Sequence, residues 1–462
     1  METLDTGATA WILMSASLVL LMTPGLAFFY GGMVRARTVL NMMLMSFLSI
    51  GVVAMTWVLY GYSMAFGDSL GGIVGNPLTH LGLSFSGDDQ SLLADSGVPF
   101  YVAAGFQMTF AIISCAIISG AIADRVKMRT WVVFVIAWLT LAYAPMAHMV
   151  WGGGLLGEDG IFASITAPVD FAGGTVVHIN AGVAGLVLAL VVGKRLGFGA
   201  GAMKPHNLPF VMLGTALLWF GWFGFNAGSA GSADDVAGLA WVNTTVAAAA
   251  AMCGWALTER LRDRAVTSLG VASGSVAGLV AITPAAAALT PVTSIAVGAL
   301  AGVCCALAVS LKFRFGYDDS LDVVGVHLVG GLVGTILIGV FATDGGLLFG
   351  GGVDLLVVQT LVALFAVVYS GLVTLVIALV LKYTLGWRVS EAEERAGIDI
   401  TRHAETAYDM STTLAARLER RRPPRITPHA PSAARLVGAS SADASPASAT
   451  PAPHAELEGA ER

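Results

Sequence analysis

The sequence predicts an all-α integral membrane protein with eleven transmembrane helices. Of its 462 residues 56% are hydrophobic and only 12% are charged, and the mean hydropathy is +0.79. Apolar runs long enough to cross a hydrocarbon core of about 30 Å recur along the chain. The Lys and Arg residues gather in alternate connections between these runs, which is the pattern of a multi-pass membrane protein.

The predicted spans follow one another with short connections up to about residue 384. Boundaries read from hydropathy alone are accurate to a few residues. The eleven segments are 9–31, 38–66, 98–123, 130–152, 173–193, 208–230, 236–258, 266–286, 291–311, 322–342 and 354–384.

The distribution of charge predicts the orientation. The connections near 35–37, 125–129, 194–204, 260–264 and 312–314 hold 13 of the 24 Lys and Arg, and the other 11 run from Lys382, at the end of the last span, to Arg462. The opposite connections carry acids instead, namely Asp68, Asp88, Asp89, Asp95, Glu158, Asp159, Asp234 and Asp235. The positive-inside rule therefore places the N-terminus outside and the C-terminus in the cytoplasm, in the cell membrane.

The first residues and the net charge exclude other classes. Met1 to Ala10 contains Glu2 and Asp5 but no basic residue, so we do not expect a cleaved signal peptide. The net charge of −6 gives no reason to expect a nucleic-acid partner. The four cysteines all fall within predicted spans, where they are expected to be buried small hydrophobic residues: Cys115, Cys253, Cys304 and Cys305.

Two histidines lie inside predicted spans, each eight residues after an aspartate. Asp170 precedes His178, and Asp319 precedes His327. Eight helical residues rise about 12 Å, so each imidazole is expected near the middle of the membrane. An ionisable group at that depth is costly and commonly lines a transport path. One such histidine could be structural, but two in equivalent places favour a function.

The Asp/His pairs suggest an internal repeat. Gly25-Leu-Ala-Phe-Phe-Tyr-Gly-Gly32 in span 1 and Gly221-Trp-Phe-Gly-Phe-Asn-Ala-Gly228 in span 6 also correspond. Spans 1–5 and 6–10 would form two five-helix halves, and because five is odd the second half is inverted, with span 11 added. Inverted repeats place the substrate path between the halves. His178 and His327 should then approach each other from opposite sides.

Neither aspartate is expected to contact its own histidine, because both the rise and the turn of a helix separate them. Asp170 should instead cap the start of its helix near Gly173 and add negative potential outside. Asp319 should be the structural acid on the cytoplasmic side. His148, near the end of span 4, is interpreted as interfacial or packed, and His206 as part of a loop that ends structure with its flanking prolines.

The chain divides into three parts by composition. Residues 1–386 form the membrane domain, and 387–411 form a polar, partly helical cytoplasmic segment. Residues 412–462 are rich in Pro, Ala, Ser and Arg and are expected to be disordered. The arginines of this tail could contact anionic membrane lipid, although a solvated charge run is the simpler interpretation.

Several stretches, in order along residues 1 to about 410, resemble the ammonium transporter family (Amt/Mep/Rh), specifically its bacterial Amt branch. They are Phe28-Phe-Tyr-Gly-Gly32, Ala147-His-Met-Val-Trp-Gly-Gly-Gly-Leu155, Asp170-Phe-Ala-Gly-Gly-Thr-Val-Val-His-Ile-Asn180, Lys204-Pro-His-Asn-Leu-Pro209, Gly221-Trp-Phe-Gly-Phe-Asn-Ala-Gly-Ser-Ala-Gly231, Ile282-Thr-Pro284 and Gly325-Val-His327.

The resemblance implies a role for each matching position. Trp151, Phe106, Ser229 and Asp170 would form or adjoin an external recruitment site for ammonium. Phe110 and Phe225 would be the paired rings that close the pore, although two aromatics four residues apart, such as Phe106 and Phe110, can also be simple packing. The remaining implied pore residues are His178, His327, Trp222 and Thr283. The resemblance also implies a homotrimer whose segment after Gly386 contacts a PII-type signal protein.

The chemistry of these residues agrees with such roles. Aromatic rings attract a bare cation by about 0.5–2 kcal/mol each, and a hydroxyl can accept an N–H bond that potassium lacks. Moving the cation into an apolar pore is costly, whereas neutral ammonia is not penalised in this way. Imidazoles, with a reference pKa of about 6.5, can relay the released proton.

Three other functions remain open at the sequence level. The protein could be an ammonium sensor that acts through its cytoplasmic segment, or a neutral ammonia gas channel resembling the Rh branch. A membrane enzyme with a histidine metal site is disfavoured, because the spans show no carboxylate–histidine cluster at metal-ligand spacing. We therefore expect no catalytic activity, no metal and no cofactor.

Overall fold

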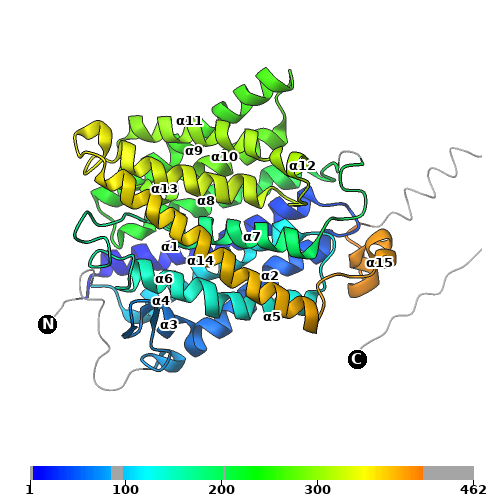
Figure 1. The fold of residues 1–462 in the computed structure, drawn as a ribbon, viewed down its shortest axis with the longest axis horizontal. Helices are drawn as coiled ribbons and strands as arrows, with labels where there is room; N and C mark the ends of the chain where they lie inside the picture. Colours follow the sequence, from blue (N-terminus) through cyan, green and yellow to red (C-terminus); the bar gives the residue numbers. More distant parts are fainter. Residues whose placement is uncertain (1–3, 85–96, 201–202, 409–462) are drawn as a thin grey trace, which may run out of the picture. The chain divides into compact units, whose positions relative to one another are not determined.

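The chain crosses the bilayer as a bundle of long helices that lie roughly side by side (Figure 1). The structure is a computed structural model and describes residues 4–84, 97–200 and 203–408. Within these residues eleven helical segments are long and apolar enough to span a membrane. The predicted number of spans is confirmed, and their bounds agree with the predicted ones to within a few residues at most ends.

Several spans are built from consecutive helical pieces. Spans 1 to 5 are α1 (Thr6–Met33); α2 (Val39–Thr56), η1 (Trp57–Gly61) and α3 (Tyr62–Phe66); α4 (Phe100–Ser119) and η3 (Gly120–Ile122); α5 (Met128–Trp138), η4 (Leu139–Tyr143) and α6 (Ala144–Trp151); and η5 (Gly174–Ile179) and α7 (Asn180–Val192).

Spans 6 to 11 and the smaller elements complete the fold. The spans are α8 (Leu208–Asn226) and η6 (Gly228–Ala230); α9 (Asp235–Arg262); α10 (Ser268–Ile282) and η7 (Thr283–Ala285); α11 (Pro291–Ala308) and α12 (Leu311–Phe315); η8 (Val324–Leu328) and α13 (Val329–Phe341); and α14 (Asp354–Thr384). The others are β1 (Ser69–Leu70), β2 (Val74–Gly75), η2 (Leu81–Leu83), η9 (Leu347–Phe349), α15 (Glu391–Ala396) and η10 (Asp399–His403).

Both histidine-bearing spans open with a π-helical turn. These turns are η5 and η8, and they contain His178 and His327 near their ends. The sequence predicts ordinary α-helix at both places, so the wider turn is a difference from the prediction. π-Helical turns are uncommon and occur frequently at functional sites. Their occurrence at both equivalent positions supports the repeat.

The contacts between helices follow the predicted inverted repeat. Span 1 packs along span 6 over much of its length, through the contact between α1 and α8. Span 5 meets span 10 in the same way, because η5 packs on α13 and α7 packs on η8. Each pair joins equivalent helices of the two halves. A pseudo-two-fold axis between the halves produces such self-pairing.

Small residues allow α1 and α8 to approach closely. A methyl group built on Gly214 would lie 2.3 Å from the backbone nitrogen of Phe29, which is too close for any side chain. This close packing is typical of helix contacts in membranes, where van der Waals contact replaces the hydrophobic drive. Substitution of Gly214 by a larger residue would therefore separate the two halves.

The long helix α14 lies obliquely across the bundle and packs against α7 and α13 (Figure 1). Gln359, on the buried side near the start of α14, donates to the carbonyl oxygens of Val169 and Thr335 and accepts from the Val169 N–H. The helix thereby fixes the loop that carries Asp170. Its other side exposes leucines and valines, as expected for a surface that faces lipid.

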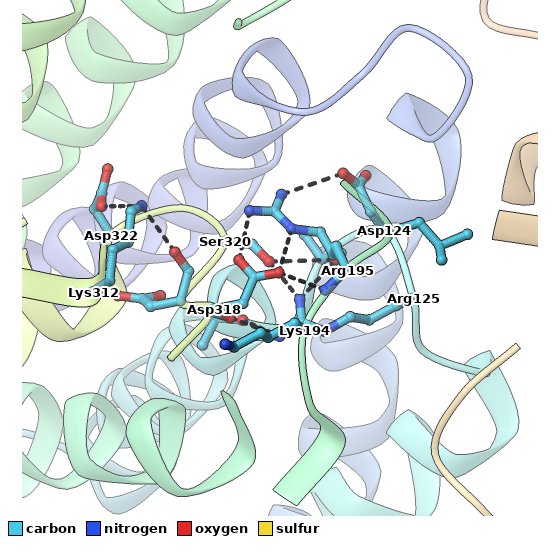
Figure 2. A network of polar contacts seen from close by, with 12 residues as sticks. Asp124, Arg125, Lys194, Arg195, Lys312, Asp318, Ser320 and Asp322 are labelled. Carbon is cyan, nitrogen blue, oxygen red and sulfur yellow. Dashed lines mark hydrogen bonds and ion pairs between the residues drawn. The ribbon is translucent and has the colours of Figure 1, made fainter. Parts of the chain in front are cut away.

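We call the end of the bundle with the Arg and Lys connections the basic face, and the opposite end the acidic face. A network of buried charges joins the connections of the basic face (Figure 2). Arg195 forms a two-pronged ion pair with Asp318 and also contacts Asp124 at 3.4 Å. Burial alone would raise the pKa of Asp318, but its bonds to Arg195 hold that pKa below the ordinary value.

Arg125 lies at the centre of the same network and is fully buried. Its guanidinium donates to the Ser320 hydroxyl and to the carbonyl oxygens of Gly193 and Asp318 (Figure 2). Burial lowers the pKa of Arg125 to about 10, against the attraction of Asp318. One arginine thus ties together the connections after spans 3, 5 and 9.

Residues 387–408, which we call the tail segment, pack within the same compact unit as the spans. Val389 donates its N–H to the carbonyl oxygen of Arg125. The Asp399 carboxylate accepts from the N–H groups of Leu40 (3.0 Å) and Asn41 (2.8 Å), so it caps α2. Residues 409–411 of the predicted regulatory segment, and the tail 412–462 predicted to be disordered, lie outside the described residues.

His206 does more than end a loop. Its Nδ1 bonds to the Val34 carbonyl oxygen and its Nε2 to the Tyr408 hydroxyl, both at 2.8 Å. It therefore links the connection after span 5 to the end of the tail segment, a role the sequence interpretation missed. The contacts join residues about 200 positions apart, so no local pattern reveals them.

The expectation that all four cysteines are buried was wrong in part. Cys115 and Cys305 are buried, but Cys304 is half-buried and Cys253 is exposed. Cys253 lies in α9, where helix position rather than residue type decides whether a side chain faces the bundle or the lipid. A membrane helix tolerates small apolar side chains on either side.

Candidate functional site

A cavity of about 380 Å³ opens on the acidic face. Aromatic side chains form much of its wall, contributed by spans 2, 3 and 4 and by the loop before span 5. Its deeper end is formed by Phe106, Phe110 and Trp151 together with Gly228 and Ser229. The structure therefore brings three aromatic residues and one hydroxyl, predicted from separate motifs, to a single cavity.

Trp151 is fixed by the loop that carries Asp170. The indole N–H donates to the Asp170 carbonyl oxygen at 2.9 Å. Gly173, with a φ of +115°, lets the chain turn beneath the indole, and a methyl group on it would lie 3.2 Å from the ring. Gly152, directly after Trp151, passes so close to the Ala65 carbonyl oxygen that no side chain fits. The backbone therefore comes very close to its neighbours on both sides of the indole.

His148 lies behind this wall and not in the cavity. Its Nδ1 bonds to the Ala65 carbonyl oxygen at 3.0 Å and its Nε2 to the Ser69 hydroxyl at 2.8 Å. The ring is completely buried. It is therefore a packed histidine that ties the 65–69 loop to α6, in agreement with the packed alternative.

Asp170 caps the helix start, as predicted. One carboxylate oxygen accepts from the N–H groups of Gly173 (3.0 Å) and Gly174 (2.6 Å), and the other from Thr175 (2.9 Å) and Val176 (3.2 Å). Burial raises the pKa of Asp170 above its ordinary value, and these four bonds oppose the rise. The carboxylate therefore satisfies four backbone donors that would otherwise be unpaired at the start of η5.

Two stacked rings close the lower end of the cavity. Phe110 and Phe225 lie parallel within 24°, with their ring centroids 4.1 Å apart. Both are fully buried. Phe106 and Trp151 meet the edge of this pair, each in an edge-to-face contact with Phe110. No opening remains between two rings at this separation, because it is close to van der Waals contact.

Directly below the rings the two histidines meet. The Nδ1 atoms of His178 and His327 are 3.3 Å apart, and the rings lie within 24° of parallel. The ring of His178 also stacks near Phe225, at 6.1 Å between centroids. The predicted approach from opposite halves is therefore confirmed. Two facing Nδ1 atoms can share one hydrogen, which fixes complementary tautomers on the two rings.

A second, narrow cavity of about 10 Å³ lies at the histidines. Apart from the two imidazoles, its wall is apolar and includes Ile113, Ile117, Leu218 and Val276. A space of this size holds about one molecule as small as water. The Nε2 atom of His178 is buried and has no hydrogen-bond partner among the described residues.

Trp222 forms one side of this narrow cavity. Its ring stacks on His178 within 18°. The indole N–H donates to the Thr283 hydroxyl at 2.8 Å, which in turn donates to the Leu279 carbonyl oxygen. Thr283 thus satisfies the only polar group of an indole that otherwise faces an apolar space. The structure therefore places Trp222 against the histidine pair and Thr283 behind the indole.

Asp319 mirrors Asp170 on the basic face. Its carboxylate accepts from the N–H groups of Val323 (3.1 Å) and Val324 (2.8 Å), at the start of η8. Burial raises the pKa of Asp319 to about 6, and Asp322 adds to the rise while Lys312 opposes it. Asp319 therefore accepts backbone N–H bonds at the start of η8, as Asp170 does at the start of η5.

Sequence reasoning missed Gln107. Its side chain lines the outer cavity, and its Oε1 atom is buried without a hydrogen-bond partner among the described residues. An unpaired buried acceptor is costly, so a cavity wall that contains one is suited to a donor from a ligand. The sequence did contain a signal for Gln107, which lies between two aromatic residues within a predicted span. A polar side chain inside the membrane is costly and commonly has a function.

The fold and the site together define a multi-pass cell membrane protein with a small-solute path between two inverted halves. The family pattern described as Ammonium Transporter Family matches residues 10–408. The chain belongs to the ammonium transporter family, and its multi-pass architecture is that of a cell membrane protein.

Curated relatives extend along nearly the whole chain. A protein of Mycobacterium bovis named ammonium transporter is 52% identical over 450 residues, covering 92% of this chain and 94% of that protein. An ammonium transporter of Bacillus subtilis is 46% identical and covers 88% and 99%. These relatives support ammonium transport as the general activity.

Solved structures resemble the fold. One described as a sensor Amt protein matches with a TM-score of 0.78 and 28% identity, covering 86% of this chain and 98% of that one. The crystal structure of Candida albicans Mep2 matches with a TM-score of 0.77 and 32% identity, covering 85% and 88%. Both likenesses agree with the helical membrane fold described above.

Proposed function

We propose that the protein takes up ammonium by binding the cation in the outer cavity, removing one proton and passing ammonia along the histidine pair. The proposal rests mainly on the position of His178 and His327, whose Nδ1 atoms are 3.3 Å apart directly behind the stacked ring pair. A hydrogen-bonded imidazole pair in an otherwise apolar cavity suits proton relay better than binding of an intact cation. The acidic face then corresponds to the outside of the cell.

The outer cavity is suited to recruit the cation. Phe106, Phe110 and Trp151 offer ring faces and edges within one wall, and each favourably placed ring contributes about 0.5–2 kcal/mol. Ser229 donates its hydroxyl hydrogen to the Phe225 carbonyl oxygen at 2.9 Å. Its oxygen lone pairs therefore remain available to accept an N–H bond. This favours ammonium over potassium, which has no hydrogen to donate.

The stacked rings and the narrow cavity disfavour the charged form. An ion that passed them would lose its water and find only apolar walls and two imidazoles, which costs several kcal/mol. Ammonia avoids this penalty because it is neutral. The proton released at the rings passes through the shared hydrogen bond of the histidines and rejoins ammonia on the basic face.

The test is a current measurement on purified protein in liposomes adsorbed to a solid-supported membrane. An ammonium jump should give a transient current, and a potassium jump should not. In His178→Ala and His327→Ala the current should fall about 100-fold, since positioned acid–base groups contribute about 10²–10⁴. The matched control is Val276→Ala, which shortens a side chain of the same cavity without removing a proton acceptor.

The outcomes of this measurement distinguish the proton relay from the alternatives. Loss of current in the histidine variants alone supports the relay. A pH change driven by ammonia without any current would make the protein a neutral gas channel and would overturn the relay. Equal loss in Val276→Ala would show that the histidines act only by filling space.

The family resemblance further leads us to propose a homotrimer with one path in each subunit, and a PII-type signal protein as partner. The tail segment lies on the basic face, where it caps α2 through Asp399. A partner bound there could alter that cap and the helices beyond it. Mass measurement of the detergent-solubilised protein tests the trimer, and co-purification with a PII protein tests the partner.

A sensor function is the second candidate. It is favoured by the likeness to a structure described as a sensor Amt protein and by the attachment of the tail segment to the spans. Ammonium binding would then change the tail segment instead of producing flux. Tight ammonium binding with neither current nor pH change would select this candidate.

A further inference from the structure

A further cavity, of about 330 Å³, lies on the basic face between the start of α5 and the tail segment. It is separate from the outer cavity and the histidine cavity, because none of its lining residues belongs to either of them. We call it the tail pocket. Its wall consists of Asn41, Val126, Lys127, Met128, Arg129, Ile398, Arg402 and His403.

The polar part of the tail pocket is basic. Its wall includes Lys127, Arg129 and Arg402, and no Asp or Glu is among the described residues that line it. His403 also lines it, with its Nε2 bonded to the side-chain oxygen of Asn41 at 3.0 Å. The nearby Asp399 carboxylate is engaged by the N–H groups at the start of α2. The cavity therefore has several cations around one space.

Two of these cations lack an acidic partner in the described part of the chain. Lys127 and Arg129 each donate to the Leu385 carbonyl oxygen, over the long distances of 3.4 and 3.3 Å. Arg402 forms an ion pair with Glu393 at 2.8 Å. That pair is partly exposed and worth little, so it can be shared with a ligand. Most of the donors on Lys127 and Arg129 stay unused.

The other walls also suit an anion at a membrane surface. Helix α5 begins at Met128 with no side-chain cap, so its first N–H groups and its dipole add positive potential to the basic wall. Val126, Met128 and Ile398 form an apolar side. Because Met128 also begins a membrane span, the pocket lies at the level of the lipid headgroups.

We propose that the tail pocket binds the phosphate group of an anionic ligand, which bridges the tail segment to the start of α5. Lys127 and Arg129 hold the phosphate from the membrane domain, and Arg402 holds it from the tail segment. Guanidinium groups match phosphate oxygens with paired hydrogen bonds. Binding therefore stabilises the tail segment in its docked position. The phosphate comes from a lipid headgroup or from a soluble phosphate, since both offer the same chemistry.

The experiment uses the full-length protein in nanodiscs and follows hydrogen exchange of residues 126–131 and 398–403. Three conditions are compared: phosphatidylcholine alone, phosphatidylcholine with added phosphatidylglycerol, and phosphatidylcholine with inorganic phosphate. We expect phosphatidylglycerol or phosphate to slow exchange in both segments together. The concentration that gives half of the protection measures the affinity.

The test variant is the double substitution Lys127→Gln and Arg129→Gln. Each basic residue near a membrane surface contributes about fivefold in affinity, so the half-protection concentration should rise roughly 30-fold. The matched control is Arg260→Gln with Arg314→Gln, which removes the same charge from exposed positions on the basic face outside the pocket. The exchange Lys127→Arg with Arg129→Lys should restore binding.

The outcomes separate the sources and decide the proposal. Protection by phosphatidylglycerol but not by phosphate assigns the site to a lipid, and protection by phosphate in phosphatidylcholine assigns it to a soluble anion. Either result supports phosphate binding in the tail pocket, provided that the pocket variant loses protection and the control variant keeps it. Protection by neither ligand overturns the proposal. So does equal loss in the control, because the effect would then come from general surface charge.

Discussion

Ser229 and Gln107 present two hydrogen-bond acceptors to the same outer cavity. The Ser229 hydroxyl donates its hydrogen to the Phe225 carbonyl oxygen, and the Gln107 side-chain oxygen has no hydrogen-bond partner within the described residues. A bound ammonium ion has four hydrogens to donate and can use both acceptors. At the level of single residues, the proposed selectivity would therefore depend on groups that accept hydrogen bonds as well as on aromatic rings.

The first prediction removes these acceptors one at a time. Ser229→Ala and Gln107→Leu should each raise the half-saturating ammonium concentration about tenfold or more, because a hydrogen bond to a charged group is worth about 1.5–3 kcal/mol. Transient currents at a series of ammonium concentrations provide the measurement. Ser232→Ala, in an exposed loop, is the control and should leave the value unchanged. Unchanged affinity in both cavity variants would contradict a role for the acceptors.

The second prediction concerns the pH dependence contributed by Asp319. Its pKa is about 6 in the folded protein and 3.8 in the unfolded chain. Between these values the folded protein keeps a proton that the unfolded chain has lost. The free energy of unfolding should therefore fall as the pH rises from about 4 to about 6, by up to about 3 kcal/mol, and then level off.

Thermal unfolding of the detergent-solubilised protein at a series of pH values tests this expectation. The difference in melting temperature between the natural protein and Asp319→Asn should change with pH across that window. For Asp263→Asn, whose bond to Arg262 lowers the pKa of the carboxyl, the difference should not fall as the pH rises through this window. Parallel curves for the natural protein and Asp319→Asn would show that the buried carboxyl does not titrate there.

Sequence patterns located most of the site at the level of residues. The spacing of Asp170 and Asp319 from their histidines was sufficient to predict both caps, because a carboxylate just before a helix has few other uses in a membrane. The exact contacts were not predictable. His206 and Gln359 act on residues far away in the chain, and only the folded structure brings these partners together.

At the level of elements, α2 obtains its cap from another part of the chain. Thr38, which precedes α2, makes no side-chain bond to the helix start, and the Asp399 carboxylate takes that place from the tail segment. The helix start is therefore complete only while the tail segment is docked. This couples span 2 to a segment some 360 residues later.

The third prediction follows from this cap. Asp399→Asn should weaken it by about 1 kcal/mol, because an amide oxygen lacks the charge that interacts with the helix dipole. Hydrogen exchange should become about fivefold faster at residues 39–42 and in the tail segment together. Asp263→Asn, which changes an exposed acid on the same face, is the control. Faster exchange in only one of the two segments would show that they are not coupled.

The π-helical turns illustrate what hydropathy cannot predict. Apolar length identifies spans 5 and 10, but it does not distinguish a π turn from an α turn, since both bury the same residues. The carboxylate caps and the contacts between the two halves lie at these same turns, η5 and η8. They are tertiary features, and the apolar length of a span contains no information about them.

At the level of the whole molecule, the described residues form one compact unit, which ends at Tyr408.

The fourth prediction is that a chain ending at Tyr408 unfolds at the same temperature as the full chain. A chain ending at Leu385 should unfold at least about 5 °C lower, because it loses the α2 cap and the ion pair between Arg388 and Glu394. Equal melting temperatures for both shortened chains would show that the tail segment adds no stability.

The overall architecture was predictable because few physical constraints decide it. Hydrocarbon thickness sets span length, charge bias predicts the orientation, and an odd number of spans in each half requires inversion. Side-chain cavities do not follow from these constraints. The tail pocket, for instance, combines Asn41, residues 126–129 and residues 398–403, which no repeat or motif relates to one another.

In the proposed mechanism, the stacked ring pair has a consequence for the speed of transport. With Phe110 and Phe225 only 4.1 Å apart, a solute taking the proposed path would have to wait until one ring moves aside. The path is then open for only part of the time, and the frequency of ring motion sets an upper limit on throughput. Because both rings are packed on all sides, each opening disturbs their neighbours and has its own activation energy. Cooling should therefore slow passage more steeply than it slows diffusion in water, as expected when a conformational change limits the rate of passage and not diffusion through an open pore.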